Sequence, residues 1–230
     1  MPVIVKRSKR YIKAAEKAVQ DLLPIDAGVA KLKEFAATKF DQSVELIFSL
    51  GIDAKQADQM IRGSLSLPHG VGKTKRVVAF CPEHLVEAAK AAGAVRAGGQ
   101  DLVQAIEKEN FTDFDVAIST PDMMRFVGRL GKVLGPKGLM PSPKAGTVTA
   151  DIASAVKEYA AGKVEYRNDT GGNIHSVVGK FSFDNAKLAD NINAMIAEIR
   201  KRKPQTSKGA YFKKVVLKGT MTPAVYLNIQ

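Results

Sequence analysis

The sequence has little of what disulfide-rich, metal-binding or membrane-spanning proteins need. Cys81 is the only cysteine among 230 residues, so no disulfide framework forms and a reducing compartment is expected. His84 follows it closely, but no second Cys or His pair stands at zinc spacing, and we expect no metal site. No apolar run approaches the roughly 20 residues that span a bilayer, and charges interrupt residues 1–13, where a signal peptide needs an apolar core. The protein should be soluble and stay where it is made.

Catalytic motifs are also missing. The three histidines are scattered, and neither a nucleophile elbow nor an HExxH motif occurs. The segment GVGKT, residues 70–74, resembles the end of a phosphate-binding loop, but Leu67 stands where that pattern requires glycine, and the expected strand follows the loop. Asp113 and Asp115 could share one strand face, although capping explains them as well. We therefore expect no enzyme and no cofactor, and keep a phosphate- or nucleotide-binding α/β enzyme as the alternative.

Acidic residues are scarce relative to basic ones, mainly at the two ends of the chain. Lys and Arg total 35 against 23 Asp and Glu, a net charge of +12, in the range of nucleic-acid binders. Residues 69–160 hold 12 basic and 10 acidic side chains, a net +2, which leaves +10 for the outer segments. A polyanion is the expected partner, and a basic adaptor that binds proteins is a further alternative.

The middle of the chain alternates between two short apolar runs, RVVAF and FDVAIST, and helical patterns. Proline at a helix start and glycine at a helix end mark the boundaries. The expected elements are strands at 76–80 and 114–120 and helices at 82–93, 101–109 and 121–134. This order predicts a parallel, doubly wound α/β unit.

The ends favour an antiparallel sheet. In VELIFSLGI, residues 44–52, every second residue is apolar and faces one side, the period-two pattern of a strand with one covered face. Further strands are expected within 162–169, 174–183, 211–219 and 224–229, with one helix over 184–201. If both ends form one α+β domain, the chain crosses to the inserted unit and back near 67–70 and 161–163, a candidate hinge. Three small domains in series are disfavoured, because neither end alone offers much core.

A long stretch of the sequence resembles a known family. Residues 113–149, DFDVAISTPDMMRFVGRLGKVLGPKGLMPSPKAGTVT, resemble the signature region of the bacterial-type large-subunit ribosomal proteins numbered one. AKLKEFAATKFDQSVELIFSLGID, GKVEYRNDTGGNIHSVVGK and GTMTP are similar to family segments in the same order. The resemblance implies a discontinuous RNA-binding α+β domain, residues 1–68 plus 161–230. A Rossmann-like α/β domain, residues 69–160, is inserted into it and joined by a two-strand hinge.

The resemblance also implies a function. Such a protein binds the stalk region of large-subunit (23S) rRNA, participates in release of deacylated tRNA from the exit site, and represses translation by binding its own mRNA leader. It works in the cytoplasm on the ribosome, without cofactor, metal or membrane, and is a monomer when free. The basic stretch 128–149 then serves the domain interface or nearby RNA, two readings that stay open.

Carry-over from the family places the RNA site in the end-built domain. The candidates are Lys39, Phe40, Ser43, Glu45, Thr220 and Met221, with Arg167, His175 and Lys180 as weaker ones. The lysines and the arginine can meet phosphates, which gives affinity and salt dependence. Ser43 and Glu45, together with the backbone of Thr220 and Met221, can hydrogen-bond to 2′-hydroxyls and base edges. Glu45 needs a donor there, which makes it a specificity residue.

The residues alone permit blander interpretations. Phe40 continues the helical spacing of apolar residues at 29, 32 and 36 and reads as core, and Met221 reads as gap-filling core. Ser43, Glu45 and His175 would be ordinary strand residues. Residues 200–203, RKRK, read as a helix end, and residues 6–13 as either an RNA arm or a solvated helix end. Two further positions depart from the family: Gly219 stands where Ser or Thr is common, and Thr222 where Gly is, so a turn that needs positive φ must differ here.

Overall fold

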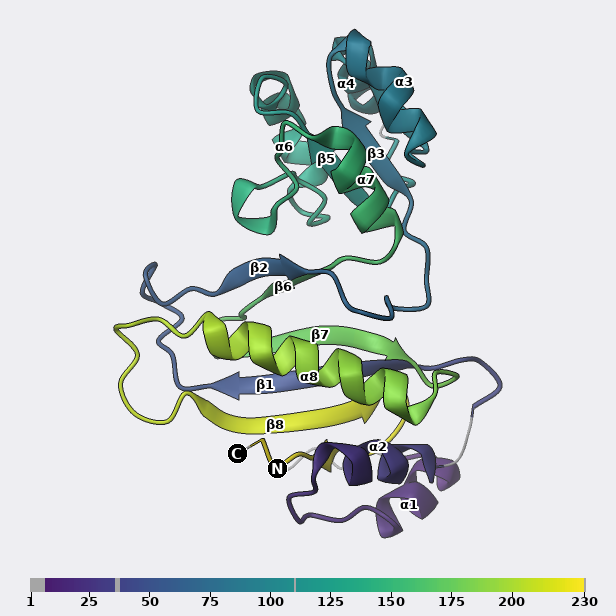
Figure 1. Ribbon diagram of the computed structural model, residues 1–230, viewed down its shortest axis with the longest axis vertical. Coiled ribbons are helices and arrows are strands. Elements are labelled where there is room, and N and C mark those ends of the chain that lie inside the picture. Colours follow the sequence, from purple (N-terminus) through teal and green to yellow (C-terminus); the bar gives the residue numbers. More distant parts are fainter. Residues whose placement is uncertain (1–6, 36–37, 110, 230) are drawn as a thin grey trace. The chain divides into compact units, whose positions relative to one another are not determined.

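The computed structural model describes residues 7–35, 38–109 and 111–229. The chain divides into two compact units (Figure 1). Unit 1 consists of Met1–Ile61, Leu67–Gly72 and Tyr166–Gln230, and unit 2 consists of Arg62–Ser66 and Lys73–Glu165. Both ends of the chain therefore contribute to one α+β unit, as the patterns predicted. None of the described helices is long and apolar enough to cross a membrane.

Unit 1 is built on an antiparallel sheet with the strand order β7-β1-β8-β9. The strands are β1 (Ser43–Leu50), β7 (Asn173–Lys180), β8 (Phe212–Gly219) and β9 (Val225–Tyr226). Along β1, buried and half-buried residues alternate without exception, which confirms the period-two prediction. The apolar side chains of Val44, Leu46 and Phe48 in β1 are fully buried on one face.

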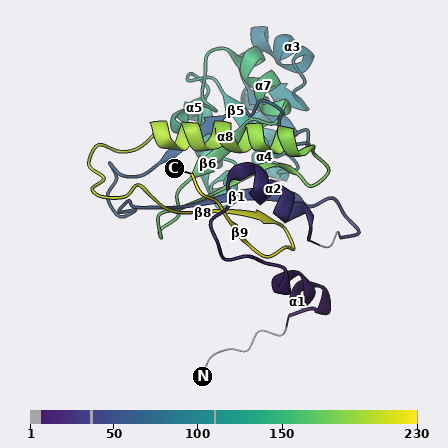
Figure 2. The ribbon, with the colours of Figure 1, turned by 60° about the horizontal axis from the view of Figure 1, so that its bottom comes forward.

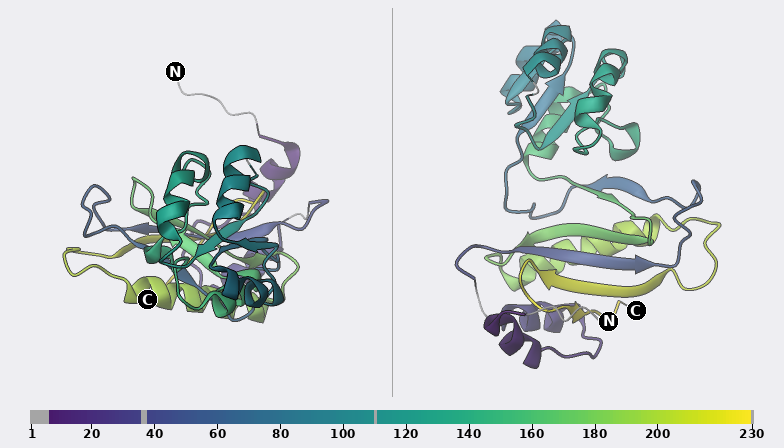
Figure 3. Two further views of the ribbon diagram at one scale, coloured as in Figure 1. Left: turned by 90° about the horizontal axis from the view of Figure 1, so that it is seen from above. Right: turned by 180° about the vertical axis from the view of Figure 1, so that it is seen from behind.

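Helices cover that face of the sheet. They are α2 (Ile25–Lys33) and α8 (Asn185–Lys201), which pack on each other and on the strands. Figure 1 shows α8 in front of the strands, and the view from behind in Figure 3 shows the strands in front of α8. The apolar stripe predicted for α8 is buried, and each such side chain contributes roughly 1.5–3 kcal/mol; it comprises Leu188, Ile192, Met195, Ile196 and Ile199. In addition, α1 (Lys9–Glu16) precedes α2.

One buried amide fastens the segment Leu67–Gly72 to the rest of unit 1. The Nδ2 group of Asn191 donates to the carbonyl oxygens of Gly70 at 2.9 Å and Val178 at 2.8 Å, and its Oδ1 accepts the His69 N–H at 3.1 Å. Because Asn191 is fully buried, these bonds satisfy a polar group that would otherwise be costly in the core.

Unit 2 holds a parallel three-stranded sheet in the order β4-β3-β5. Its strands are β3 (Val77–Phe80), β4 (Arg96–Gly98) and β5 (Val116–Ser119), and its longer helices are α3 (Glu83–Ala91), α4 (Gln100–Glu109) and α7 (Ile152–Ala160). Val78 and Phe80 face the core on the α4 side, while Val77 and Ala79 face the core on the α3 and α7 side. The predicted doubly wound unit is therefore confirmed, although β4 was not predicted.

The helix predicted over 121–134 is broken into short pieces. They are α5 (Met124–Val127), the 3-10 turn η1 (Gly128–Leu130) and α6 (Gly131–Leu134), followed later by the 3-10 turn η2 (Pro143–Ala145). Gly128 and Gly131 stand at the junctions, and glycine inside a helix costs about 0.5–1 kcal/mol relative to alanine, so the continuous helix is not favoured.

Two short strands lie where the chain passes from one unit to the other. They are β2 (Arg62–Leu65) and β6 (Val164–Arg167), which form a separate two-stranded sheet. Arg62 joins them through Nη2, 2.7 Å from Oε1 of Glu165.

Asp113 and Asp115 have structural partners. Both bind Arg76, directly before β3, and Oδ2 of Asp115 accepts the Arg76 backbone N–H at 3.0 Å. That hydrogen bond lowers the pKa of Asp115 below its ordinary value. These carboxylates therefore fix the starts of β3 and β5.

Candidate nucleic-acid interface

The candidate site centres on the point where β1 begins and β8 ends. The backbone N–H of Thr220 donates to the carbonyl oxygen of Ser43 at 3.1 Å, and the N–H of Ser43 donates to Oγ1 of Thr220 at 3.2 Å. Nζ of Lys180, at the end of β7, donates to Oγ of Ser43 at 2.9 Å. Three residues predicted from distant parts of the sequence are thus brought together.

A buried glutamine positions the neighbouring turn. Gln42 is only 1% exposed, and its Oε1 accepts the backbone N–H of Met221 at 2.8 Å. Its backbone oxygen accepts the N–H of Phe181, which follows β7. Sequence reasoning missed Gln42, since a lone glutamine between two candidates carries no signal of its own.

Two large apolar side chains of this region are exposed. Phe40 is 54% exposed and Met221 is 48% exposed, so the interpretation of both as core is wrong. The helical spacing that suggested a buried Phe40 does not apply, because α2 ends at Lys33. Lys39, beside Phe40, is also exposed. An exposed aromatic ring next to a lysine suits nucleic acid, whose bases stack and whose phosphates attract cations.

Glu45 lies on the sheet face turned away from α2 and α8. The neighbours Val44 and Leu46 point to the covered face, and the register between β1 and β7 shifts at Val44 and Glu45. Lys218 of β8 lies directly opposite Glu45 in the sheet, and such opposite charges stabilise a strand pair. Sequence reasoning missed Lys218, which shares the sheet face of Glu45 because the two residues are paired across β1 and β8.

The weaker candidates spread along the sheet. His175 is exposed on β7 opposite Ile47, five residues before Lys180, which corresponds to about 16 Å of strand. Arg167 is exposed at the end of β6, outside the four-stranded sheet. After it, Oδ1 of Asp169 accepts the N–H groups of Gly171 at 2.9 Å and of Asn173 at 2.7 Å, which closes the turn before β7. His175 and Arg167 are therefore peripheral to the centre formed by Ser43 and Thr220.

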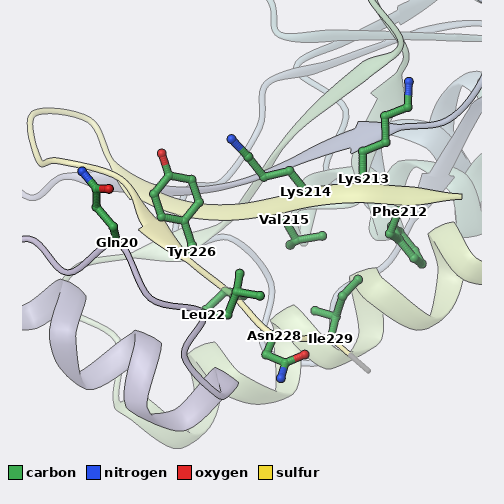
Figure 4. A pocket seen from close by; sticks show the side chains of 10 residues that line it. Gln20, Leu22, Phe212, Lys213, Lys214, Val215, Tyr226, Asn228 and Ile229 are labelled. Atoms are coloured by element: carbon green, nitrogen blue, oxygen red, sulfur yellow. The ribbon is translucent and has the colours of Figure 1, made fainter. Parts of the chain in front are cut away.

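No arrangement typical of catalysis occurs in the part of the chain that the structure describes. It holds no group of three or more His, Cys, Asp and Glu side chains able to bind a metal ion. A hollow of 610 Å³ lies beside β8 and β9, lined by apolar Leu22 and Val215 and by the polar groups of Lys213 and Tyr226 (Figure 4). Nζ of Lys214, also on its rim, lies 5.1 Å from the centre of the Tyr226 ring. The hollow contains none of the nine candidates.

Comparison with known proteins decides the family. The profile of the "Ribosomal protein L1p/L10e family" matches residues 32–223. The chain is 50% identical over 226 residues to "Large ribosomal subunit protein uL1" of Kosmotoga olearia, which covers 98% of this chain and 97% of the relative. The chain belongs to this ribosomal protein family. The protein of the same name from Thermobifida fusca is 49% identical, covering 96% and 94%, and that from Methylobacillus flagellatus is 51% identical, covering 89% of each.

Membership in the L1p/L10e family confirms the resemblance seen in the sequence. The chain is a ribosomal protein, not an enzyme. The alternative of a nucleotide-binding enzyme is therefore set aside. The segment GVGKT, residues 70–74, is followed by β3 and not by a helix.

Gly219 and Thr222, the two departures from the family pattern, are in direct contact. A Cβ atom on Gly219 would come 2.9 Å from Cε2 of Phe181 and 3.1 Å from Cγ2 of Thr222. Thr222 is buried, and its hydroxyl accepts the N–H of Gly219 at 2.8 Å and donates to the carbonyl oxygen of Pro223 at 3.0 Å. The side chain of Thr222 thus fills the space next to Gly219, and one departure accommodates the other.

Proposed function

We propose that this protein binds the stalk region of large-subunit (23S) rRNA through unit 1. Its family makes it a structural constituent of the large ribosomal subunit. One observation carries the RNA proposal: the start of β1 is hydrogen-bonded to the Thr220–Met221 turn, and exposed Phe40 and Met221 flank that junction. Exposed apolar side chains are unfavourable in water, whereas RNA bases and riboses can cover them and RNA phosphates attract the neighbouring basic residues.

Six of the nine candidates have a specific chemical role in the proposal. Lys39 and Lys180 neutralise phosphates, which supplies affinity without sequence information. Phe40 packs on a base or ribose, and Thr220 with Ser43 offers hydroxyl groups to the RNA minor groove. Glu45 accepts a hydrogen bond from a 2′-hydroxyl or a base amine, because a carboxylate beside phosphate would otherwise be repelled.

The division of labour between the domains belongs to the same proposal. RNA binding resides in residues 1–68 plus 161–230, and residues 69–160 form the inserted domain. The mRNA leader bound in translational repression competes with the rRNA, because one surface cannot hold both. On the cytoplasmic ribosome, the rRNA stalk held by this protein takes part in release of exit-site tRNA.

The test separates affinity from discrimination. Binding of a stalk rRNA fragment and of an unrelated RNA duplex is measured for the whole protein at about 50 and 200 mM salt. Lys39→Ala should weaken both complexes and make the slope of log K against log salt less steep by about one unit. Glu45→Ala should instead reduce the ratio of the affinity for the stalk fragment to the affinity for the unrelated duplex.

Lys203, exposed after α8, provides the matched control, since Lys203→Ala removes one charge outside the site. Equal effects of Lys39→Ala and Lys203→Ala would remove Lys39 from the site. A parent protein without preference for the stalk fragment at either salt concentration would overturn the proposed function.

A further inference from the structure

The first described helix has little packing of its own. Of its eight residues, α1 buries only Ala14, and Figure 2 shows α1 standing away from the sheet of unit 1. Its start is well formed, because Oγ of Ser8 accepts the backbone N–H of Tyr11 at 3.3 Å. An isolated helix of this length is marginal in water, and helices in proteins depend mainly on packing of an apolar face. The packing that holds α2 and α8 in place is largely missing for α1.

The side chain of Arg10 connects α1 to the candidate RNA site through one hydrogen bond. Nη2 of Arg10 donates to the carbonyl oxygen of Met221 at 3.4 Å, across 211 positions of the sequence. The N–H of the same Met221 is held by Gln42 at 2.8 Å. The backbone of the exposed methionine is thus held on one side by buried Gln42, directly before β1, and on the other by a cationic helix.

The charges of α1 have no acidic counterpart in its first turn. Lys9 and Lys13 are both exposed, and they are four residues apart on one helix face, where like charges destabilise a helix. The guanidinium carbon of Arg7 lies 5.0 Å from the centre of the Tyr11 ring, and Ile12 is 48% exposed. Glu16 is the single acidic residue of α1, against Lys9, Arg10 and Lys13. This excess of cations beside exposed apolar groups favours docking on a polyanion.

The geometry points to α1 as a second, phosphate-contacting element of the RNA site. Arg10 anchors the helix beside Met221, and Lys9 and Lys13 meet backbone phosphates of the RNA that the Ser43–Thr220 centre recognises. This inference rests on the proposed function and adds to it a contact outside the residues carried over from the family. RNA replaces the missing packing, so α1 becomes more stable in the complex than in the free protein.

The test uses the full chain with the stalk rRNA fragment. The double variant Lys9→Gln/Lys13→Gln should lose affinity and flatten the salt slope by about 1.5 units, since each phosphate contact contributes about 0.7–0.9. The matched control is Lys201→Gln/Lys203→Gln, which removes the same charge at the C-terminal end of α8 (Figure 1). Hydrogen exchange provides an independent readout: the Ile12 amide, bonded to the Ser8 carbonyl at 3.0 Å, should exchange at least tenfold more slowly when RNA is bound.

The outcomes separate the two proposals. Parent protein that prefers the stalk fragment, combined with an unchanged salt slope in Lys9→Gln/Lys13→Gln, would overturn the role of α1 and leave the proposed function intact. An equal loss in the α8 control would also overturn it, because the effect would then follow net charge alone. Parent protein without any preference for the stalk would overturn both.

Discussion

The side chain of Gln42 accepts the backbone N–H of Met221 at 2.8 Å, although 179 positions separate the two residues. The backbone of Gln42 also accepts the N–H of Phe181, so the start of β1, the end of β7 and the turn after β8 meet at one buried residue. Met221 is exposed while its support is not. The shape of the proposed RNA site therefore depends on a residue that does not reach the surface.

Substitution of Gln42 should impair RNA binding indirectly. In Gln42→Leu, the Met221 N–H loses its acceptor, which costs about 1–3 kcal/mol if the group stays buried. Nε2 of Gln42 has no hydrogen-bond partner in the part of the chain described by the structure, so the substitution breaks no further side-chain hydrogen bond. We expect a lower free energy of unfolding in urea and weaker binding to stalk RNA.

Gln59 provides the control for that substitution. It is also buried, and its Oε1 accepts the N–H of Asp53 at 2.8 Å, away from the site. Gln59→Leu should destabilise the fold and leave RNA affinity unchanged when the protein is folded. The same loss of affinity in both variants would show that stability alone decides binding.

Phe40 should contribute to binding and hardly to stability. With 54% of its surface exposed, Phe40→Ser should change the free energy of unfolding by no more than about 0.5 kcal/mol. The affinity for stalk RNA should fall about fivefold to a hundredfold, because stacking of one base on an aromatic ring contributes about 1–3 kcal/mol. Urea unfolding and RNA titration of the same preparation test this, and a large loss of stability with intact binding would restore the core interpretation.

Gly219 and Thr222 should show strong coupling in a double-mutant cycle. Gly219→Ser alone places a side chain against Phe181 and Thr222 and should destabilise unit 1. Thr222→Gly alone removes the hydroxyl that binds the Gly219 N–H. The double variant restores the common family pattern and should be more stable than the sum of the single effects, by about 0.5–3 kcal/mol. Additive unfolding free energies would show that the two departures are independent.

Tyr211 should make stability fall at alkaline pH. Its hydroxyl donates to the carbonyl oxygen of Ile199 at 2.9 Å, and burial raises its pKa to about 12. The ordinary tyrosine pKa is about 10, so its contribution is complete below about pH 10 and is lost as the pH rises through about 12. Tyr211→Phe should be less stable at neutral pH by about 1 kcal/mol. The free energy of unfolding in urea, measured between about pH 9 and 12, should decline less steeply with pH for Tyr211→Phe than for the parent protein. Equal declines in the two proteins would contradict the assignment of this pH dependence to Tyr211.

Local patterns in the sequence determined most elements of both units. The alternation in β1 predicted a strand with one covered face because successive side chains of a strand point to opposite sides. The apolar runs that became β3 and β5 are buried on both faces, as expected for a parallel sheet. In contrast, β4 has the sequence Arg-Ala-Gly, which offers no apolar run, and only pairing with β3 makes it a strand.

The sequence by itself determined the two-unit fold class, the family and the basic character of the ends, because period, charge and motif are local properties of a chain. Only the tertiary structure decided that Phe40 and Met221 are exposed and that Gln42 and Arg10 hold the Met221 backbone. Those contacts join segments separated by 179 and 211 positions. No local pattern specifies such a pair, since strand register and the packing of the chain ends bring it together.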